Sequence, residues 1–346
     1  MLNALSSEIV LRKDYLDHET IETIYFGGGT PSLLSADELK IIMDQITDQF
    51  EVSSYAEITL EANPDDLNKQ YVREIQNSFI NRFSIGVQSF HEDDLRWMNR
   101  AHTAAEALGA IKRIQDAGFE NITADLIYGF PLLSNQKWEY NINQLVECRI
   151  PHLSTYAMTV EPKTALAAFI NKGSERVMDE NQSASQFLML IDLLMESDFE
   201  HYEISNFAKP GMYSRHNSNY WNGVKYLGIG PSAHSFNGES RQWNISNNLK
   251  YITGLELKSI QAETEVLSIE NRINEYIMTS LRTSKGMNLQ VISEKFGSDY
   301  SDEISLGLEG FLEKKWISIN EQIVSLTREG KLFADHIASD LFLQAI

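Results

Sequence analysis

The sequence predicts an α/β protein, and three observations support that fold class. Short apolar runs that end in Gly, Pro or Asn alternate with amphipathic stretches of about a dozen residues. The apolar runs are apolar on both faces, as are the strands of a parallel sheet that helices cover. A chain of 346 residues with 42% hydrophobic and 23% charged positions has the size and composition of a folded protein of about two domains. Repeated βα units of this kind build either a barrel or a doubly wound sheet.

The elements of the repeat are predicted in order along the chain. The predicted strands are 21–26, 57–62, 82–87, 122–128 and 153–158, with 202–206 as a further candidate. The predicted helices are 35–50, 103–117 and 135–148, and the first begins with the capping signal Ser35-Ala36-Asp37-Glu38. An amphipathic helix over 1–15 precedes them, although a βα series should open with a strand. Either the fold tolerates this order, or a strand that belongs before Met1 is missing.

A second pattern begins near Leu267. Helices are predicted over 270–281, 289–296 and 303–315, followed by a hairpin of 316–319 and 322–326 with Asn320-Glu321 as its turn. Three helices and a small hairpin resemble a winged helix, which would usually indicate DNA binding, but a lid or packing domain is the alternative. We predict a first domain over 1–240, a connector over 241–266 and a small, mainly helical, winged-helix-like domain over 267–346.

Charge and cysteine content exclude several classes of protein. With 29 Lys and Arg against 49 Asp and Glu, the net charge of −20 repels phosphate backbones, so nucleic acid is not an expected partner. No apolar run reaches the ~20 residues that a membrane helix needs. Glu8, Arg12 and Lys13 interrupt the start of the chain, so we expect no signal peptide and a cytoplasmic location. The single cysteine, Cys148, excludes an internal disulfide and a thiolate metal cage.

A glycine-rich loop follows the first predicted strand. The segment Tyr25-Phe26-Gly27-Gly28-Gly29-Thr30-Pro31-Ser32 has more glycines than a tight turn requires. Its exposed N–H groups suit a carboxylate or phosphate, and Thr30 adds a hydroxyl group. The loop is not a Walker motif, because no Gly-Lys-Ser/Thr follows it. A ligand-binding loop is therefore the favoured interpretation over a plain βα turn.

Polar residues also follow or interrupt the next predicted strands. Glu61 lies at the end of strand 57–62, Gln88 follows strand 82–87, Asp125 lies within strand 122–128, and Arg100 occurs in the loop before it. The carboxyl ends of parallel barrel strands converge on one mouth, so we expect these four side chains to gather there. The arginine suits a carboxylate and the two acids suit ribose hydroxyls. The pattern predicts a site for an amino-acid-like ligand with hydroxyl groups.

The motifs together resemble the oxygen-independent coproporphyrinogen III oxidase-like family of radical SAM proteins. They are the glycine loop with Tyr25 to Ser32, Glu61-Ala62-Asn63-Pro64, Gly86-Val87-Gln88-Ser89-Phe90, Asn99-Arg100-Ala101-His102, Asp125-Leu126-Ile127-Tyr128-Gly129-Phe130-Pro131 and His152-Leu153-Ser154-Thr155-Tyr156. The resemblance implies a partial (β/α)6 radical SAM barrel whose first strand is missing here. It also implies an S-adenosylmethionine site lined by Gly28, Gly29, Thr30, Glu61, Gln88, Arg100 and Asp125.

A further motif resembles the HemW-type branch of that family, whose members are heme chaperones. His216-Asn217-Ser218-Asn219-Tyr220-Trp221 matches the HNxxYW signature of the branch. Chemically, a histidine can ligate heme iron and aromatic rings can stack on a porphyrin. The resemblance therefore makes His216, Tyr220 and Trp221 the heme candidates, although packing and hydrogen bonding alone would also account for them. The later segment Gly228-Ile229-Gly230-Pro231-Ser232-Ala233 mimics a dinucleotide fingerprint, but its proline and the lack of a following helix argue against one.

The sequence departs from its family at the cluster loop. The family holds a [4Fe–4S] cluster with a Cys-x3-Cys-x2-Cys loop, and Cys148, predicted to be a small buried side chain, is the only cysteine here. We expect an N-terminally truncated or misassigned start, with a natural cluster-free variant as the alternative. Without the thiolates there is no metal site for the cluster and no radical catalysis, so enzyme activity is left open.

Three functions follow from the resemblance. The first is a heme chaperone that passes heme to an acceptor hemoprotein. The second is an oxygen-independent coproporphyrinogen III oxidase (dehydrogenase) of porphyrin biosynthesis, and the third is a cluster-free paralogue that only binds ligands. The motif from His216 to Trp221 favours the first.

Overall fold

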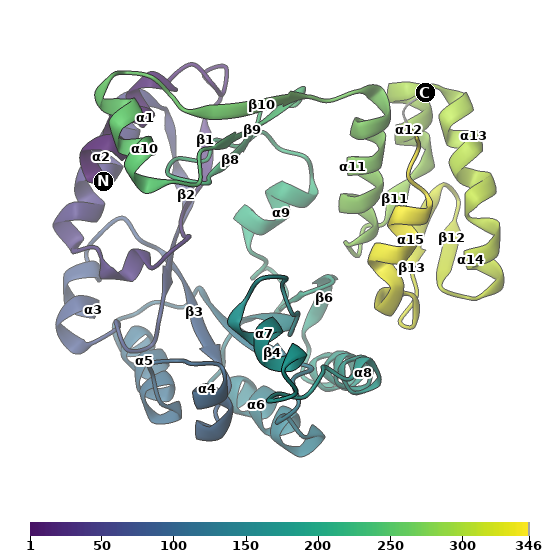
Figure 1. Cartoon of the computed structure of the whole chain (residues 1–346), viewed down its shortest axis with the longest axis horizontal. Helices are drawn as coiled ribbons and strands as arrows, with labels where there is room; N and C mark the ends of the chain where they lie inside the picture. The colour runs from purple at the N-terminus through teal and green to yellow at the C-terminus, as the bar shows by residue number, and fades with distance from the viewer. Residues whose placement is uncertain (345–346) are drawn as a thin grey trace. The chain divides into compact units, whose positions relative to one another are not determined.

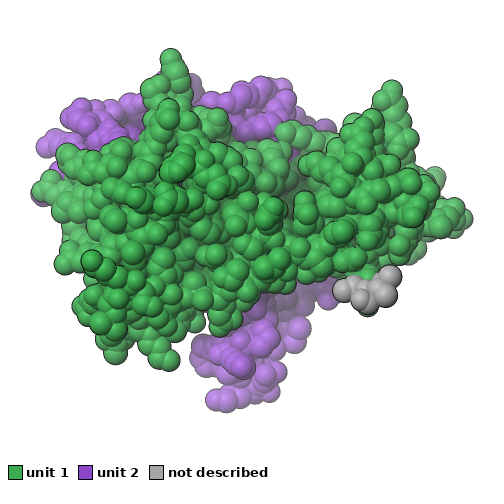
Figure 2. Space-filling view, turned by 90° about the horizontal axis from the view of Figure 1, so that it is seen from above, with its two compact units in different colours: residues 1–24, 34–57, 215–346 green, residues 25–33, 58–214 purple. Residues whose placement is uncertain are grey.

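The computed structural model describes residues 1–344. The chain divides into two compact units, shown in two colours in Figure 2. Unit 1 comprises Met1–Ile24, Leu34–Glu57 and Arg215–Ile346, and unit 2 comprises Tyr25–Leu33 and Ile58–Ser214. No helix in the described part of the chain is long and apolar enough to cross a membrane. The domain boundaries at 240 and 267 and the cytoplasmic location stay predictions.

A seven-stranded sheet curled into a half-barrel confirms the predicted fold class (Figure 1). Its strand order is β1 (Ile21–Phe26), β2 (Val52–Ala62), β3 (Arg82–Gln88), β4 (Ile122–Tyr128), β5 (His152–Ala157), β7 (Asn206–Ala208) and β6 (Glu200–Glu203). Parallel pairing runs from β2 through β5, whereas β7 pairs antiparallel with both of its neighbours. The parallel strands therefore end at one common edge, where the predicted site residues lie.

The candidate strand 202–206 is a hairpin instead of one strand. It covers the end of β6, the turn Ile204-Ser205 and the start of β7. The turn is stabilised by Glu203, whose Oε2 accepts hydrogen bonds from the Ser205 N–H at 3.0 Å and the Asn206 side chain at 2.5 Å. Apolar periodicity did not reveal this turn. A carboxylate that accepts a hydrogen bond from the backbone just after it looks, in the sequence, like any polar residue of a strand.

The helices of the repeat begin where the sequence predicts. Ser35 caps α2 (Ala36–Gln49) and Thr103 caps α5 (Ala104–Asp116), each in a capping box, and Ser134 caps α6 (Asn135–Glu147). In unit 2, α5, α6 and α8 (Glu180–Glu196) contact the sheet (Figure 1). Each of these helices buries apolar side chains. The remaining helices of this unit are η1 (Pro31–Leu33), α3 (Lys69–Ile75), α4 (Glu92–Trp97) and α7 (Ala165–Asn171).

Unit 1 begins with α1 (Leu2–Leu11), which is shorter than the predicted helix 1–15. It packs on α2 and α10 (Asn248–Glu256). Glu8 of α1 is fully buried, and Arg12, which follows the helix, is nearly so. Unit 1 also contains α9 (Arg215–Trp221) and a small antiparallel sheet of β8 (His234–Phe236), β9 (Ser240–Asn244) and β10 (Ala262–Val266).

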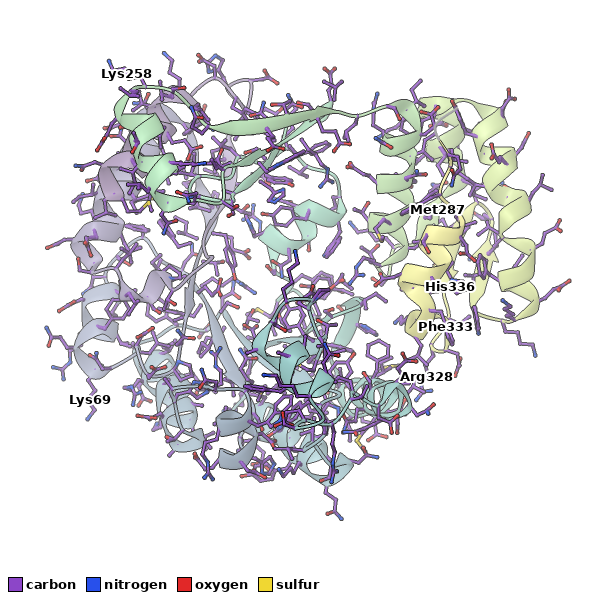
Figure 3. The ribbon with its side chains drawn as sticks, viewed as in Figure 1. Lys69, Lys258, Met287, Arg328, Phe333 and His336 are labelled. Atoms are coloured by element: carbon purple, nitrogen blue, oxygen red, sulfur yellow. The ribbon has the colours of Figure 1, made fainter. Side chains whose placement is uncertain are left out.

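The C-terminal part of unit 1 has its own apolar core. Its elements are α11 (Ile269–Leu281), β11 (Met287–Asn288), α12 (Leu289–Phe296), α13 (Ser298–Gly307), α14 (Glu309–Glu313), β12 (Ile317–Asn320), β13 (Ile323–Leu326), η2 (Gly330–Phe333) and α15 (Ala334–Asp340). Met287 is fully buried in this core, and Phe333, which Figure 3 labels near His336, stacks on Trp316 with 4.0 Å between the ring centroids. The prediction of a mainly helical C-terminal region is thus confirmed.

Two details of that region differ from the prediction. The predicted helix 303–315 is two helices, α13 and α14, which meet at Leu308. The hairpin turn lies at Glu321-Gln322 instead of Asn320-Glu321, because Asn320 still pairs with Ile323 and Glu321 takes the positive φ of 55°. Asp and Asn tolerate such a φ best, so glutamate at this position gives little sequence signal for the turn.

Candidate functional site

The glycine loop after β1 has a conformation that glycine alone takes without strain. Gly28 and Gly29 have φ values of +71° and +66°, and both are exposed with open space where a side chain would stand. Gly27 is constrained differently, because an added Cβ would lie 2.3 Å from the Tyr25 ring and 2.9 Å from the Glu61 carboxylate. The loop therefore presents bare backbone beside Glu61, and Thr30 ends it at the start of η1.

Two acids of the predicted site lie close together on the sheet. In the strand registers, Glu61 pairs with Ser84 and Asp125 pairs with Ser154. The Ser84 hydroxyl donates to Asp125 Oδ1 at 3.5 Å. Burial and then the nearby Glu61 carboxylate raise the pKa of Asp125 to about 7. This carboxyl group therefore changes its charge near neutral pH, which is a common property of functional sites.

Tyr25 belongs to the same cluster. Burial, followed by the charges of Glu61 and Asp125, raises the pKa of its hydroxyl well above the ordinary value of 10.0. The tyrosine hydroxyl thus stays protonated at every physiological pH. The cluster of Tyr25, Glu61, Ser84 and Asp125 comes from the four adjacent strands β1 to β4, and all four residues belong to unit 2.

Gln88 and Arg100 form a second group around Gly86. An added Cβ at Gly86 would lie 2.9 Å from Gln88 Nε2 and 3.1 Å from Arg100 Nη2. Arg100 Nη2 donates to Asn63 Oδ1 at 2.8 Å and to the Gly86 carbonyl at 3.3 Å. The buried His102 ring bonds the Val87 carbonyl at 3.0 Å and so fixes the loop that carries Arg100. The structure brings a guanidinium and two amide side chains together where the adjacent strands β2 and β3 end.

All seven predicted contacts to the adenosyl ligand lie in unit 2, in two neighbouring groups of the same sheet edge. Sequence reasoning did not include Ser84, and it named Tyr25, Asn63 and Ser154 only as members of motifs and not as site residues, although all four complete these groups. Asn63 carries a detectable signal, since it is a polar residue directly after the end of β2. Ser84 and Ser154 give no such signal, because each is the third residue of its strand and only its position beside Asp125 distinguishes it from an ordinary strand serine.

His216 lies at the start of α9 in unit 1. Its backbone N–H donates to Glu57 Oε1 at 2.9 Å, and the Arg215 N–H donates to Oε2 of the same carboxylate at 3.1 Å. The His216 Nδ1 atom is 2.9 Å from the Thr23 hydroxyl. The Tyr220 ring packs edge-on against the imidazole with 5.1 Å between centroids. His216 is therefore held by residues of β1 and β2 and by the next turn of its own helix.

Trp221 belongs to different surroundings from those of His216 and Tyr220. Its ring stacks under the Arg282 guanidinium, 5.3 Å from the ring centroid. Together with Met278 and His336 it lines a shallow surface cavity formed by α9, α11 and α15. The three heme candidates thus divide into a histidine–tyrosine pair and a tryptophan that contacts the C-terminal helices.

The residues present do not fit an iron–sulfur cluster. Cys148 is the only cysteine and caps the C-terminus of α6, partly buried instead of fully buried. Burial raises the pKa of its thiol above the model-compound value of 9.0, which disfavours the thiolate that iron requires. Among residues 1–344 no group of three or more His, Cys, Asp and Glu side chains is arranged to hold a metal ion.

Comparison with protein families identifies two regions of the chain. Residues 6–145 match the radical SAM superfamily, and residues 267–333 match the HemN C-terminal domain. The first region contains all seven residues predicted to contact S-adenosylmethionine. The second covers most of the predicted winged-helix-like region.

Similar curated proteins and solved structures cover nearly the whole chain. Heme chaperone HemW of Bacillus subtilis is 33% identical over 97% of this chain and 89% of its own length. Heme chaperone HemW of Lactococcus lactis is 30% identical over 95% of this chain and 86% of its own length. The structure of coproporphyrinogen III oxidase (HemN) from Escherichia coli, a radical SAM enzyme, matches with a TM-score of 0.84 at 20% identity, over 99% of this chain and 82% of that chain.

Proposed function

Because the chain belongs to the heme chaperone HemW family of radical SAM proteins, we propose that it binds heme and passes it to an acceptor hemoprotein. The observation that supports this function most strongly is the similarity to HemW proteins along both units and the C-terminal region. Heme is the cargo in this proposal, so it arrives and leaves instead of staying as a resident cofactor. Binding must therefore be strong enough to capture heme and weak enough to release it to the acceptor.

His216 is the proposed iron ligand and Tyr220 its aromatic neighbour. An imidazole is a frequent axial ligand of heme iron, and an aromatic ring can pack against the porphyrin. The short helix α9 is fixed at its first residues, which limits the freedom of the imidazole. Trp221 stays the third heme candidate, and its ring also links α9 to the end of α11 through Arg282.

Unit 2 is the proposed S-adenosylmethionine site. Gly28, Gly29 and Thr30 offer backbone N–H groups and a hydroxyl to the amino-acid end of the ligand. Glu61 and Asp125 accept hydrogen bonds from ribose hydroxyls. Gln88 and Arg100 bind the carboxylate of S-adenosylmethionine, and Asn63 orients the Arg100 guanidinium. The bare glycine backbone and the paired acids fit such a ligand. When bound, S-adenosylmethionine supplies a cationic sulfonium with a transferable adenosyl or methyl group.

Binding of S-adenosylmethionine is expected to depend on pH through Asp125. Its pKa lies near 7, so the group is protonated below that pH and ionised above it. The carboxylate accepts ribose hydroxyls better than the neutral acid, so affinity should rise about tenfold between about pH 6 and about pH 8. Calorimetric titration at several pH values measures this, with Asp125→Asn expected to flatten the profile. The exposed Asp116→Asn is the control, and a profile of Asp125→Asn equal to wild type contradicts the assignment.

Coproporphyrinogen III oxidation is the alternative function. The fold of the HemN structure supports this alternative. At 20% identity, however, the similarity shows only that the two proteins share a fold. The residues present also lack the thiolates for a cluster. The chaperone function is favoured because relatives at 30% identity or more over nearly the full chain carry that name.

The test of the proposed function is capture and release of heme by the intact chain. Purified protein is loaded with one equivalent of hemin, followed by its Soret absorption, and then mixed with an apo-hemoprotein. We expect stoichiometric binding and a transfer rate that rises with acceptor concentration. Coproporphyrinogen III is offered in parallel, and its oxidative decarboxylation without hemin binding would refute the proposal in favour of the alternative.

A further inference from the structure

The start of α9 is attached to two neighbouring strands by contacts from both backbone and side chains. Glu57 of β2 is almost fully buried, and its two oxygens accept the N–H groups of Arg215 and His216. The Arg215 guanidinium in turn donates to the Tyr55 carbonyl at 2.7 Å. A buried carboxylate at the first N–H groups of a helix satisfies donors that the helix itself cannot. The backbone of His216 is thus fixed before any ligand arrives.

The ring of His216 is fixed by a separate contact. Thr23 of β1 places its hydroxyl 2.9 Å from Nδ1, which is a normal hydrogen-bond distance. A threonine hydroxyl can accept an N–H as well as donate its own proton, so it is compatible with the Nδ1–H tautomer. These two residues are separated by 193 positions in the sequence, and their contact is made by the fold alone.

We propose that Thr23 is a positioning residue that holds the His216 imidazole through Nδ1 and so directs Nε2 to heme iron. The inference rests on the proposed heme-binding function and adds the group that orients the ligand. A metal-ligating histidine usually donates its second ring N–H to an oxygen acceptor, which fixes the tautomer and the ring orientation. With Nδ1 bonded to Thr23, Nε2 is the ring nitrogen that iron uses. Thr23 itself touches neither iron nor porphyrin in this arrangement.

A structural role of Thr23 makes a different prediction from a positioning role. If the hydroxyl only helped to pack β1 against α9, its loss would weaken every ligand of the site equally. If it orients the imidazole, its loss affects iron ligation and leaves contacts with the porphyrin ring unchanged. Metal-free protoporphyrin IX separates the two cases, because it has the same macrocycle and propionates as hemin but no iron.

The experiment compares hemin and protoporphyrin IX binding by wild type, Thr23→Val, Thr23→Ser and His216→Ala in the full chain. Valine keeps the shape of threonine without the hydroxyl, and serine keeps the hydroxyl. We expect Thr23→Val to weaken hemin binding by about 10–100-fold and to alter the axial-ligand absorption bands, with protoporphyrin IX binding unchanged. Thr23→Ser should retain both the affinity and the spectrum of wild type.

Two results overturn the inference, and they are distinguishable from failure of the proposed function. In the first, Thr23→Val has the hemin affinity and spectrum of wild type, while His216→Ala loses both. This result would refute the positioning role of Thr23 and leave the role of His216 standing. An equal loss of hemin and protoporphyrin IX binding in Thr23→Val would show a structural role. If wild type does not bind hemin, or if His216→Ala binds it as wild type does, the assignment of His216 falls and the inference falls with it.

Discussion

Replacing Glu8 with alanine is expected to lower the free energy of unfolding by about 3–5 kcal/mol. The Glu8 carboxylate is fully buried and accepts hydrogen bonds from Arg12 Nε at 2.8 Å, the Gly230 N–H at 2.9 Å, Asn244 Nδ2 at 2.7 Å and the Tyr251 hydroxyl. Its removal leaves the nearly buried Arg12 guanidinium without its carboxylate partner. The effect is large because an uncompensated buried charge and several unsatisfied donors arise together.

Urea unfolding followed by circular dichroism measures the effect of Glu8→Ala. Glu19→Ala is the matched control, since it removes an exposed carboxylate whose ion pair with Lys225 at 2.7 Å lies at the surface. Such a pair contributes about 0–1 kcal/mol. Equal unfolding midpoints for the two variants would contradict the account of α1 as an element anchored by its buried ion pair.

A methyl group at Gly330 is expected to destabilise the C-terminal region by about 3 kcal/mol or more. A Cβ at this glycine would lie 1.7 Å from the Trp316 carbonyl oxygen and 2.6 Å from its carbonyl carbon, both of them backbone atoms. That carbonyl accepts the Thr327 N–H at 2.9 Å where the chain leaves the hairpin of β12 and β13. The clash cannot be relieved by a side-chain rotation, so the strand connection itself must move.

Gly310→Ala is the control for Gly330→Ala. Gly310 lies in α14, and an added Cβ meets nothing within 4 Å, so alanine should stabilise this helix by up to about 1 kcal/mol. Thermal unfolding monitored by tryptophan fluorescence reports on Trp316 in both variants. The account of this region is contradicted if the two substitutions shift the transition in the same direction by similar amounts.

Much of the βα repeat could be predicted from the sequence because its signals are local. Strands β1 and β4 match their predicted ranges residue for residue, since apolar runs bounded by turn residues define both ends. Capping residues such as Ser35 and Thr103 identify the helix starts. The glycine loop with Glu61 and Asp125 is also local information, because parallel strands bring their carboxyl ends together without further detail.

The features that could not be predicted depend on contacts between distant residues. A glutamate in an amphipathic helix normally faces water, so the burial of Glu8 against Asn244 and Tyr251 has no signal in the sequence of α1. Thr23 and Glu57 look like ordinary strand residues until α9 is placed beside them. Likewise, the motif from His216 to Trp221 suggests a single cluster of side chains. Helical geometry instead separates them: Tyr220, one turn after His216, packs against the imidazole, whereas Trp221 lies beside Arg282.

The central claim is that His216 ligates the iron of bound heme, and a hemin titration of His216→Ala tests it most directly. His18→Ala is the matched control, because the His18 side chain is 80% exposed and lies outside both proposed sites. We expect His216→Ala to bind hemin about 100-fold more weakly or worse, since loss of the ligand costs more than the 10–100-fold of an outer partner. His18→Ala should bind as wild type does. Equal hemin affinities and Soret spectra for His216→Ala and His18→Ala would contradict the account.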